Sequence, residues 1–262
     1  METKLTTRPV ILVTGSAKRT GLAILTEFAG AGYDVAIQYR SSSDEADAAA
    51  IALAKLGARA NAYHADLNRD QDIAALVDHV YRDFGRLDVL VNNAAIFFQD
   101  KFIDFKVEDF DETWRINCRA PILLTRAMYD HAKRLGQLGT VINIVDQKVK
   151  GNFHADHFSY TVAKTALGNL TSMLAISCQP VLRVNGIFPG LMLPSDDQTQ
   201  EDFEYAAKVS NPLGYAVGPA DLARTALELA HPRYNGTDIV LDAGQNLWRV
   251  DQDVIYKYRN PE

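Results

Sequence analysis

The stretch that most constrains the fold of this chain lies near its N-terminus, where a short apolar run meets a glycine turn and then an amphipathic helix. Residues 9–14 (PVILVT) are aliphatic and β-branched, which predicts a strand buried on both faces. Residues 15–21 (GSAKRTG) supply the turn, and residues 22–31 the helix, which ends at Gly32. Backbone N–H groups at the start of such a helix point towards an anion, and the helix dipole adds to the attraction. We therefore interpret residues 15–21 as a phosphate-binding turn, with an ordinary strand-to-helix turn as the alternative.

The same alternation of strand and helix continues along the whole chain. Further strands are predicted at residues 33–39, 58–64, 88–91, 140–145, 181–188 and 238–241, and helices at 44–56, about 70–84, 107–135, up to about 178, and 219–231. A chain of 262 residues has room for one α/β domain or two small ones. No repeat, linker or shift of composition interrupts it, so we predict one domain over residues 1–262. Its predicted fold class is α/β, a Rossmann-like doubly wound parallel sheet of about seven strands with helices on both faces.

Composition and charge exclude several classes of protein. The net charge is −6 and no dense run of Lys or Arg occurs, which argues against nucleic acid and anionic membranes as partners. The first ten residues (METKLTTRPV) lack the apolar core of a signal peptide, and no apolar stretch reaches the length of a membrane span. Cys118 and Cys178 are interpreted as reduced core thiols. We therefore predict a cytoplasmic enzyme that acts on a small molecule.

No motif indicates a metal ion or a serine nucleophile. The only closely spaced histidines are His154 and His157, and no carboxylate triad lies near them in the sequence. A G-x-S-x-G nucleophile elbow is also absent from the sequence.

The end of the second predicted strand indicates which dinucleotide the chain binds. In NAD-binding folds an acidic residue at this position receives the ribose hydroxyls, whereas here Tyr39 is followed by Arg40 and Ser41. A guanidinium and serine hydroxyls would bind a 2′-phosphate, which a carboxylate would repel. Lys18 and Arg19 in the glycine turn add positive charge on the same side. The combination predicts NADP(H) rather than NAD(H).

Other predicted strand ends carry residues suited to the same ligand. Asp66 either accepts a hydrogen bond from an adenine amino group or caps the helix that begins near residue 70, and both interpretations stay open. Asn93 and its small neighbours permit a ligand to approach the backbone closely. Phe97 is either a core residue or a stacking platform for a flat substrate. Residues 191–217 are long enough for a substrate lid, and the polar tail after Trp248 is expected to pack on a neighbouring subunit.

Tyr160 and Lys164 lie four positions apart at the start of a predicted helix, so the two side chains share one face. A nearby ammonium favours the phenolate and lowers the pKa of the tyrosine, which suits a general acid near neutral pH. A solvated surface pair is the alternative interpretation. Asn117 lies inside the predicted helix 107–135, where asparagine is unfavourable, so it is either tolerated on the surface or retained for a hydrogen bond.

Five motifs, in this order and spacing, resemble the short-chain dehydrogenase/reductase family over essentially the whole chain: TGSAKRTG, NNAA, Asn117, YTVAK and VNGIFPG. The resemblance implies an oxidoreductase in which Tyr160 supplies a proton, Lys164 holds the nicotinamide ribose and Asn117 positions Lys164 through water. It also implies a homotetramer. The residues expected to contact NADP(H) are Gly15, Lys18, Arg19, Thr20, Gly21, Tyr39, Arg40, Ser41, Asp66, Leu67, Asn93, Ala94, Tyr160, Lys164, Pro189 and Gly190.

Two residues depart from the common family pattern. Asp146 stands where the family commonly has a catalytic serine, and Arg19 replaces the middle glycine of the turn. With Phe97, they resemble the pteridine reductase branch and the related bacterial dihydromonapterin reductases. The resemblance implies that Asp146, Tyr160 and Lys164 serve the reduction of a pterin C=N bond. It further implies that Arg19 reaches pterin and phosphate, and that Phe97 stacks on the pterin.

We predict an NADPH-dependent reductase of a dihydropterin, such as dihydromonapterin, or of a related folate, with Tyr160 as proton donor. A pterin is flat and rich in N–H donors, which suits a carboxylate, whereas an ionised Asp146 would repel the oxyanion of a ketone reduction. One alternative is a carbonyl or 3-oxoacyl reductase of the same family, and another is a non-catalytic NADP-binding regulatory protein. For Asp146 itself the alternative is a residue that caps its own loop.

Overall fold

A seven-stranded parallel sheet forms the centre of the protein, in the strand order β3-β2-β1-β4-β5-β6-β7. The computed structural model describes residues 7–195 and 198–257. Three of the predicted segments extend beyond these residues: the N-terminal decapeptide includes 1–6, the lid includes 196–197 and the polar tail includes 258–262. The observed sheet confirms the predicted fold class.

Strands and helices alternate as the sequence predicts. The first half of the chain supplies β1 (Val10–Val13), α1 (Arg19–Gly30), β2 (Asp34–Tyr39), α2 (Ser43–Ala54), β3 (Ala60–His64), α3 (Asp70–Phe84) and β4 (Val89–Asn92). The second half supplies α4 (Val107–Trp114), a π turn (Arg115–Arg119), α5 (Ala120–Leu135), β5 (Gly139–Ile144), a 3₁₀ turn (Gln147–Lys150), α6 (Phe158–Ser177), β6 (Leu182–Pro189), α7 (Gln200–Ser210), α8 (Pro219–Leu229), β7 (Asp238–Leu241), a second 3₁₀ turn (Gln245–Leu247) and α9 (Val254–Lys257).

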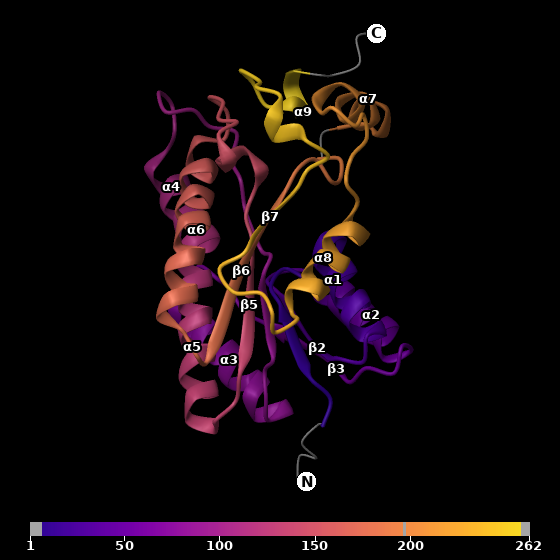
Figure 1. Ribbon diagram of the computed structural model, residues 1–262, viewed down its shortest axis with the longest axis vertical. Helices are drawn as coiled ribbons and strands as arrows, with labels where there is room; N and C mark the ends of the chain where they lie inside the picture. Colours follow the sequence, from indigo (N-terminus) through magenta and orange to yellow (C-terminus); the bar gives the residue numbers. More distant parts are fainter. Residues whose placement is uncertain (1–6, 196–197, 258–262) are drawn as a thin grey trace.

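Helices cover both faces of the sheet, in two layers that Figure 1 shows on either side of the strands. One layer contains α3, α5 and α6, and the other contains α1, α2 and α8. Because both faces are covered, β1 and β5 are buried along their whole length, which explains the continuous apolar sequence of β1. By contrast, β7 lies at the edge of the sheet and is only partly buried.

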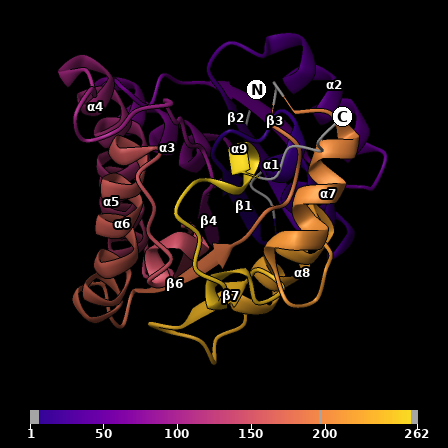
Figure 2. The same cartoon turned by 90° about the horizontal axis from the view of Figure 1, so that it is seen from above.

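All strands point towards the same end of the sheet, because each pairs with its neighbours in parallel. The chain order reverses between β1 and β4, which lie side by side although β2 and β3 separate them in sequence. Ligands of doubly wound sheets bind in the crevice at such a switch point. Figure 2, which views the molecule from above, shows α9 close to the centre of this end.

Most predicted boundaries differ by one or two residues from those observed, and two differ more. Helix α1 begins at Arg19 rather than at residue 22, so the end of the glycine turn is already helical. The predicted helix 107–135 is divided by the π turn into α4 and α5. The described part of the tail after Trp248 contains α9, which packs on α7 of the same chain, and contact with a neighbouring subunit stays a prediction.

Within residues 7–195 and 198–257, no helix combines the length and the apolar character needed to cross a membrane. Cys118 and Cys178 are both buried and free.

Candidate active site

The glycine turn after β1 is built for close contact with the end of β4. Gly15 adopts a left-handed conformation (φ 62°), and a Cβ atom on it would lie 3.1 Å from the Cα of Ala94. Thr14 closes the turn, because its Oγ1 accepts hydrogen bonds from the backbone N–H groups of Asn93 (2.9 Å) and Ala94 (3.0 Å). At Gly21, a Cβ would lie 2.5 Å from the carbonyl oxygen of Gly15, so the helix start approaches the turn without room for a side chain.

Arg19 adopts an unfavourable backbone conformation at the start of α1. Its φ of 55° lies in the left-handed region that favours glycine, which explains why a glycine is common at this position in the family it resembles. Its guanidinium Nη2 donates to the carbonyl oxygen of Pro194 at 2.8 Å, in the segment predicted to be a lid. A strained residue held by a contact across the site is typical of a functional position.

A cavity of about 410 Å³ opens beside the glycine turn. Its walls contain these residues of the predicted cofactor set: Gly15, Lys18, Arg19, Thr20, Arg40, Asp66, Leu67, Asn93 and Ala94. Gly21, Tyr39 and Ser41 do not line it. The ring of Tyr39 instead lies edge-on to His64, with ring centres 5.7 Å apart. The structure therefore gathers most of the predicted nucleotide contacts around one hollow at the switch point.

Two basic groups beside this cavity, Arg40 and Lys18, are paired with carboxylates. Arg40 Nη1 lies 3.5 Å from Oε1 of Glu112, and Lys18 Nζ lies 3.6 Å from Oε1 of Glu45. Both pairs are substantially exposed, and such surface ion pairs contribute little to stability. Their cations can therefore exchange a carboxylate for an anionic ligand at low cost.

Asp66 caps its own loop, and a residue absent from the predicted set supports the turn beside it. Oδ1 of Asp66 accepts from the backbone N–H of Asn68 at 3.0 Å, two residues before α3 begins. Gln38 bridges β1 and β3: its Oε1 accepts from the N–H of Gly15 (2.7 Å), and its Nε2 donates to the carbonyl of Ala65 (2.8 Å). A glutamine directly after the apolar run Val35–Ile37 of a buried strand was the signal for it.

A second cavity, of about 300 Å³, adjoins the first, since Arg19, Thr20 and Asn93 line both. Its walls also contain the other predicted site residues Phe97, Asp146, Tyr160, Lys164, Pro189 and Gly190. The two hollows therefore form one continuous site along the carboxyl ends of β1, β4, β5 and β6.

Asp146 has two hydrogen-bonding roles, one for each carboxylate oxygen. Oδ1 accepts from the backbone N–H of Lys148 at 2.8 Å and so caps the first 3₁₀ turn. Oδ2 accepts from the hydroxyl of Tyr160 at 3.0 Å. Capping of the loop and contact with the tyrosine, which the sequence presented as alternatives, therefore coexist.

Lys164 lies beneath the tyrosine on the same helix, α6. Its buried Nζ donates to the carbonyl oxygen of Ile144 at 2.6 Å and lies 5.7 Å from the centre of the Tyr160 ring. Burial lowers the pKa of Lys164 to about 8, against the opposing effect of the Asp146 carboxylate.

The expectation of a lowered tyrosine pKa was wrong for the protein without ligands. Desolvation, and then the charge and hydrogen bond of Asp146, raise the pKa of Tyr160 well above its ordinary value. Burial is the main reason, and the Asp146 carboxylate adds to it by accepting the hydroxyl's hydrogen bond, whereas the Lys164 ammonium is bonded to the carbonyl of Ile144. Tyr160 therefore holds its proton firmly and directs it at Asp146.

Asn117 lies in the π turn between α4 and α5 and is fully buried. Its Oδ1 accepts from the backbone N–H of Ile96 at 2.9 Å, and its Nδ2 donates to the carbonyl of the same residue at 2.6 Å. Of the two interpretations of this asparagine, retention for a hydrogen bond is the correct one. Its direct partner is the segment after β4, next to Phe97.

Phe97 is 57% exposed and forms one wall of the second cavity. Its ring lies edge-on to Tyr160 and to His157, with ring centres 6.1 Å and 5.5 Å apart. A core role for Phe97 is therefore excluded, and its face is open towards the site.

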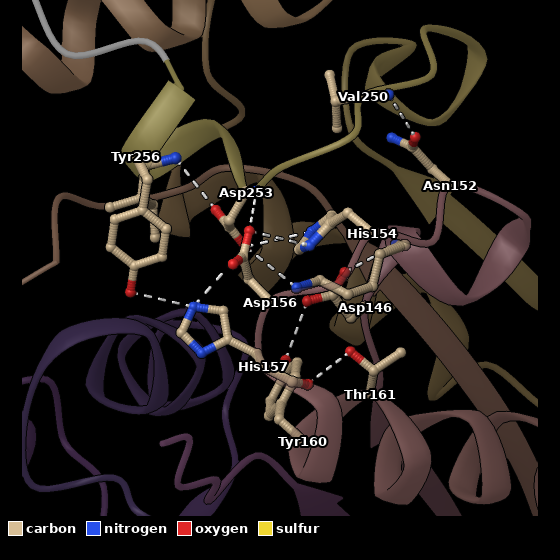
Figure 3. Close-up of polar contacts among 12 residues, drawn as sticks. Asp146, Asn152, His154, Asp156, His157, Tyr160, Thr161, Val250, Asp253 and Tyr256 are labelled. Carbon is tan, nitrogen blue, oxygen red and sulfur yellow. Dashed lines mark hydrogen bonds and ion pairs between the residues drawn. The ribbon is translucent and has the colours of Figure 1, made fainter. Parts of the chain in front are cut away.

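A group of charged residues beside Tyr160 escaped detection in the sequence (Figure 3). Oδ2 of Asp253 lies 3.2 Å from Nζ of Lys148 and 3.4 Å from Nε2 of His154. All three residues line the second cavity. No sequence pattern links residues about a hundred positions apart. Within the part of the chain that the structure describes, no group of three or more His, Cys, Asp or Glu side chains is placed to hold a metal ion.

Comparison with known proteins identifies the family. A family model described as enoyl-(acyl carrier protein) reductase matches residues 15–246. The chain is 30% identical over 246 residues to 3β-hydroxysteroid dehydrogenase 1 of Eggerthella lenta, covering 91% of this chain and 94% of that protein. The chain belongs to the short-chain dehydrogenase/reductase family and is an oxidoreductase of that family.

Two solved structures show how closely the fold is shared. FolM alternative dihydrofolate reductase 1 of Brucella canis, in complex with NADP, is 36% identical and superposes with a TM-score of 0.86, covering 94% of this chain and 96% of that one. Acetoin dehydrogenase YohF of Salmonella typhimurium is 27% identical, with a TM-score of 0.84 and coverage of 94% and 99%. The similarity to FolM supports the predicted resemblance to pterin reductase-like members of the family.

Proposed function

We propose that this protein is an NADPH-dependent reductase of a dihydropterin or a related folate. The observation that carries the proposal is the hydrogen bond of 3.0 Å between the Tyr160 hydroxyl and the Asp146 carboxylate, in a cavity whose wall includes the open ring of Phe97. A carboxylate here accepts N–H groups, and a pterin presents several of them on a flat ring.

Three features of the first cavity fit NADPH. The glycine turn leaves no space for side chains at Gly15 or Gly21, so a pyrophosphate can approach the backbone. The start of α1 carries no acidic residue in its first turn, which favours an anion there. Arg40 and Lys18 stand beside the cavity as partners for a 2′-phosphate.

The chemistry follows from the residues of the second cavity. NADPH, when bound, supplies the hydride that a ring carbon of the substrate C=N bond receives. Tyr160 holds the proton for the ring nitrogen. A substrate N–H group that binds Asp146 would replace the tyrosine hydroxyl as the partner of that carboxylate and so free the hydroxyl. The buried ammonium of Lys164 stabilises the phenolate left behind.

The similarity to FolM, a protein described as a dihydrofolate reductase in complex with NADP, supports this assignment. A carbonyl reductase is the second candidate, because the steroid and acetoin dehydrogenases named above belong to the same fold and family. Asp146 favours the first candidate, since an ionised carboxylate beside Tyr160 opposes a developing oxyanion. Residues 191–217 as a lid, a homotetrameric assembly and a cytoplasmic location complete the proposal.

NADPH oxidation with a panel of substrates tests the proposed function. We expect turnover with dihydrobiopterin, dihydromonapterin or dihydrofolate, and little with simple ketones. Turnover confined to ketones would establish the carbonyl reductase instead. Background rates with every compound, together with tight NADPH binding, would point to a regulatory NADP-binding protein.

Arg40→Ala tests the preference for NADPH. We expect the Kd for NADPH to rise about tenfold, because the guanidinium supplies a charge-assisted hydrogen bond to the 2′-phosphate, while the Kd for NADH changes less than about twofold. Fluorescence titration of both cofactors measures this ratio. Lys55→Ala removes an exposed cation at the end of α2 and serves as the control. Equal losses for NADPH and NADH would contradict the assignment.

A further inference from the structure

The C-terminal segment, residues 250–257, forms one wall of the second cavity. Val250, Asp253, Val254 and Ile255 all line it, as do the residues proposed to react. Three of these four residues are apolar, and Asp253 directs its carboxylate towards Lys148 and His154. In a doubly wound sheet the switch point lies at the ends of the strands, so a segment from the end of the chain can cover it from above.

Asp253 fastens this segment to the loop that precedes the catalytic helix. Its Oδ2 forms a buried ion pair with Lys148 (3.2 Å) and lies 3.4 Å from Nε2 of His154. Its backbone N–H donates to Oδ2 of Asp156 at 2.8 Å. Its Oδ1 accepts from the N–H of Ile255 at 3.1 Å and so shapes the start of α9. One residue therefore joins the wall to three residues of the segment between β5 and α6.

His157 extends the connection, because it lies between Tyr256 (Figure 3) and the ring of Phe97. The hydroxyl of Tyr256 lies 3.3 Å from Nε2 of His157, while Nδ1 of the same ring lies 2.8 Å from the carbonyl oxygen of Phe98. His157 adopts a left-handed backbone conformation (φ 56°) immediately before α6, the helix that carries Tyr160. A strained residue held by contacts on both sides transmits the position of the wall to the start of the catalytic helix.

Helix α9 also packs on α7, which belongs to the segment predicted to be a lid. Figure 1 shows the two helices next to each other beyond the end of the sheet. The lid helix and the C-terminal segment therefore form a common cover, and the contacts of Asp253 tie that cover to the reacting side of the cavity.

We propose that residues 250–257 form a substrate-binding wall that the chain supplies to its own active site, and that Asp253 is the positioning residue that holds this wall in place. The inference rests on the proposed oxidoreductase site and not on the identity of its substrate. Because Lys148 neutralises Asp253, the wall offers the substrate an apolar surface made by Val250, Val254 and Ile255. This surface suits the flat, uncharged face of a small heteroaromatic or carbonyl compound.

Asp253→Asn tests the proposal in the full-length enzyme. Removing the charge weakens the ion pair with Lys148, so a smaller fraction of the molecules has the wall docked. The apparent affinity for substrate falls in proportion to that fraction. We expect the KM for dihydrobiopterin to rise about tenfold, while kcat and the Kd for NADPH change less than about threefold. Asp253→Glu retains the carboxylate and should recover part of the loss.

Two further variants distinguish a specific effect on the wall from a general loss of protein stability. Asp130→Asn removes an exposed carboxylate on α5, ion-paired with Arg126 and outside both cavities, and should leave all constants unchanged. Tyr256→Phe keeps every charge, removes only the hydroxyl near His157, and should raise KM in the same direction by about two- to threefold.

Hydrogen–deuterium exchange gives a readout that needs no substrate. The amides of Val250, Asp253 and Ile255 are hydrogen-bonded in the docked segment. We expect about tenfold faster exchange of residues 250–257 in Asp253→Asn and unchanged exchange of the same residues in Asp130→Asn. Unchanged exchange in Asp253→Asn, or a fall in kcat without a rise in KM, would overturn the proposal.

The experiments distinguish a wrong proposal about the wall from a wrong proposal about the substrate. A wild-type enzyme that ignores pterins but reduces a ketone rejects the pterin assignment, and the comparison of KM values is then made with that ketone. In either case, the hydrogen–deuterium exchange experiment tests whether Asp253 holds residues 250–257 in place.

Discussion

Tyr160→Phe is expected to reduce kcat by about 100- to 10,000-fold, the range that a positioned general acid contributes. The hydroxyl is the only group that the substitution removes, and it is the group that donates to Asp146 at 3.0 Å in the second cavity. The Kd for NADPH should change little, because the ring that remains occupies the same volume. Single-turnover NADPH oxidation and fluorescence titration measure the two quantities separately.

Tyr129→Phe is the matched control for this experiment. Tyr129 lies on α5, away from both cavities, with Lys133 Nζ 5.5 Å from its ring centre. Its hydroxyl should be dispensable for turnover. Undiminished kcat in Tyr160→Phe would reject the proton-donor role and with it the proposed mechanism.

Asp146→Ser is expected to change the preferred substrate. The serine cannot accept an N–H group as strongly as a carboxylate, and loss of a charged hydrogen-bond partner costs about 1.5–3 kcal/mol, so kcat/KM for the pterin should fall about 10- to 100-fold. For a ketone the same change removes a repulsive charge and adds a donor, so kcat/KM should be maintained or should rise. Assays with dihydrobiopterin and a simple ketone measure the ratio.

Electrostatics predicts a second consequence of the same substitution. The Asp146 carboxylate raises the pKa of Tyr160 and also that of Lys164, so its removal shifts both pKa values downwards. The pH profile of ketone reduction should therefore move to lower pH.

Asp146→Asn is the control for the loop, since the amide oxygen can still cap the N–H of Lys148. A variant that loses pterin and ketone activity in equal proportion would show that Asp146 holds the loop and does not select the substrate.

The nucleotide half of the site was predictable because its residues follow directly from strand ends. Gly15, Asn93 and Pro189 each stand at the end of a buried apolar run, and parallel strands must bring their carboxyl ends to one edge. Gln38 is the exception in this half. Its side chain turns back to the glycine turn from within a buried strand, a direction that a pattern of burial alone does not reveal.

The second cavity, where the reaction is proposed to occur, was only partly predictable, because the pKa values of its side chains depend on which groups are in contact. The spacing of Tyr160 and Lys164 correctly placed both at one cavity, yet it predicted a lowered tyrosine pKa where the fold raises it. Sequence spacing fixes which face of a helix two residues share, but the bond from Lys164 to the carbonyl of Ile144 is set by the neighbouring strand.

By itself, the amino-acid sequence determined the order of strands and helices, the parallel sheet and the place of the glycine turn, because these depend on local periodicity and turn residues. Only the tertiary structure decided that Asp146 serves both its loop and Tyr160, that Asn117 holds the segment after β4, and that the chain's own C-terminal segment covers the cavity. Asp253 and Lys148 are 105 positions apart, and such a pair forms through folding geometry that no local pattern encodes.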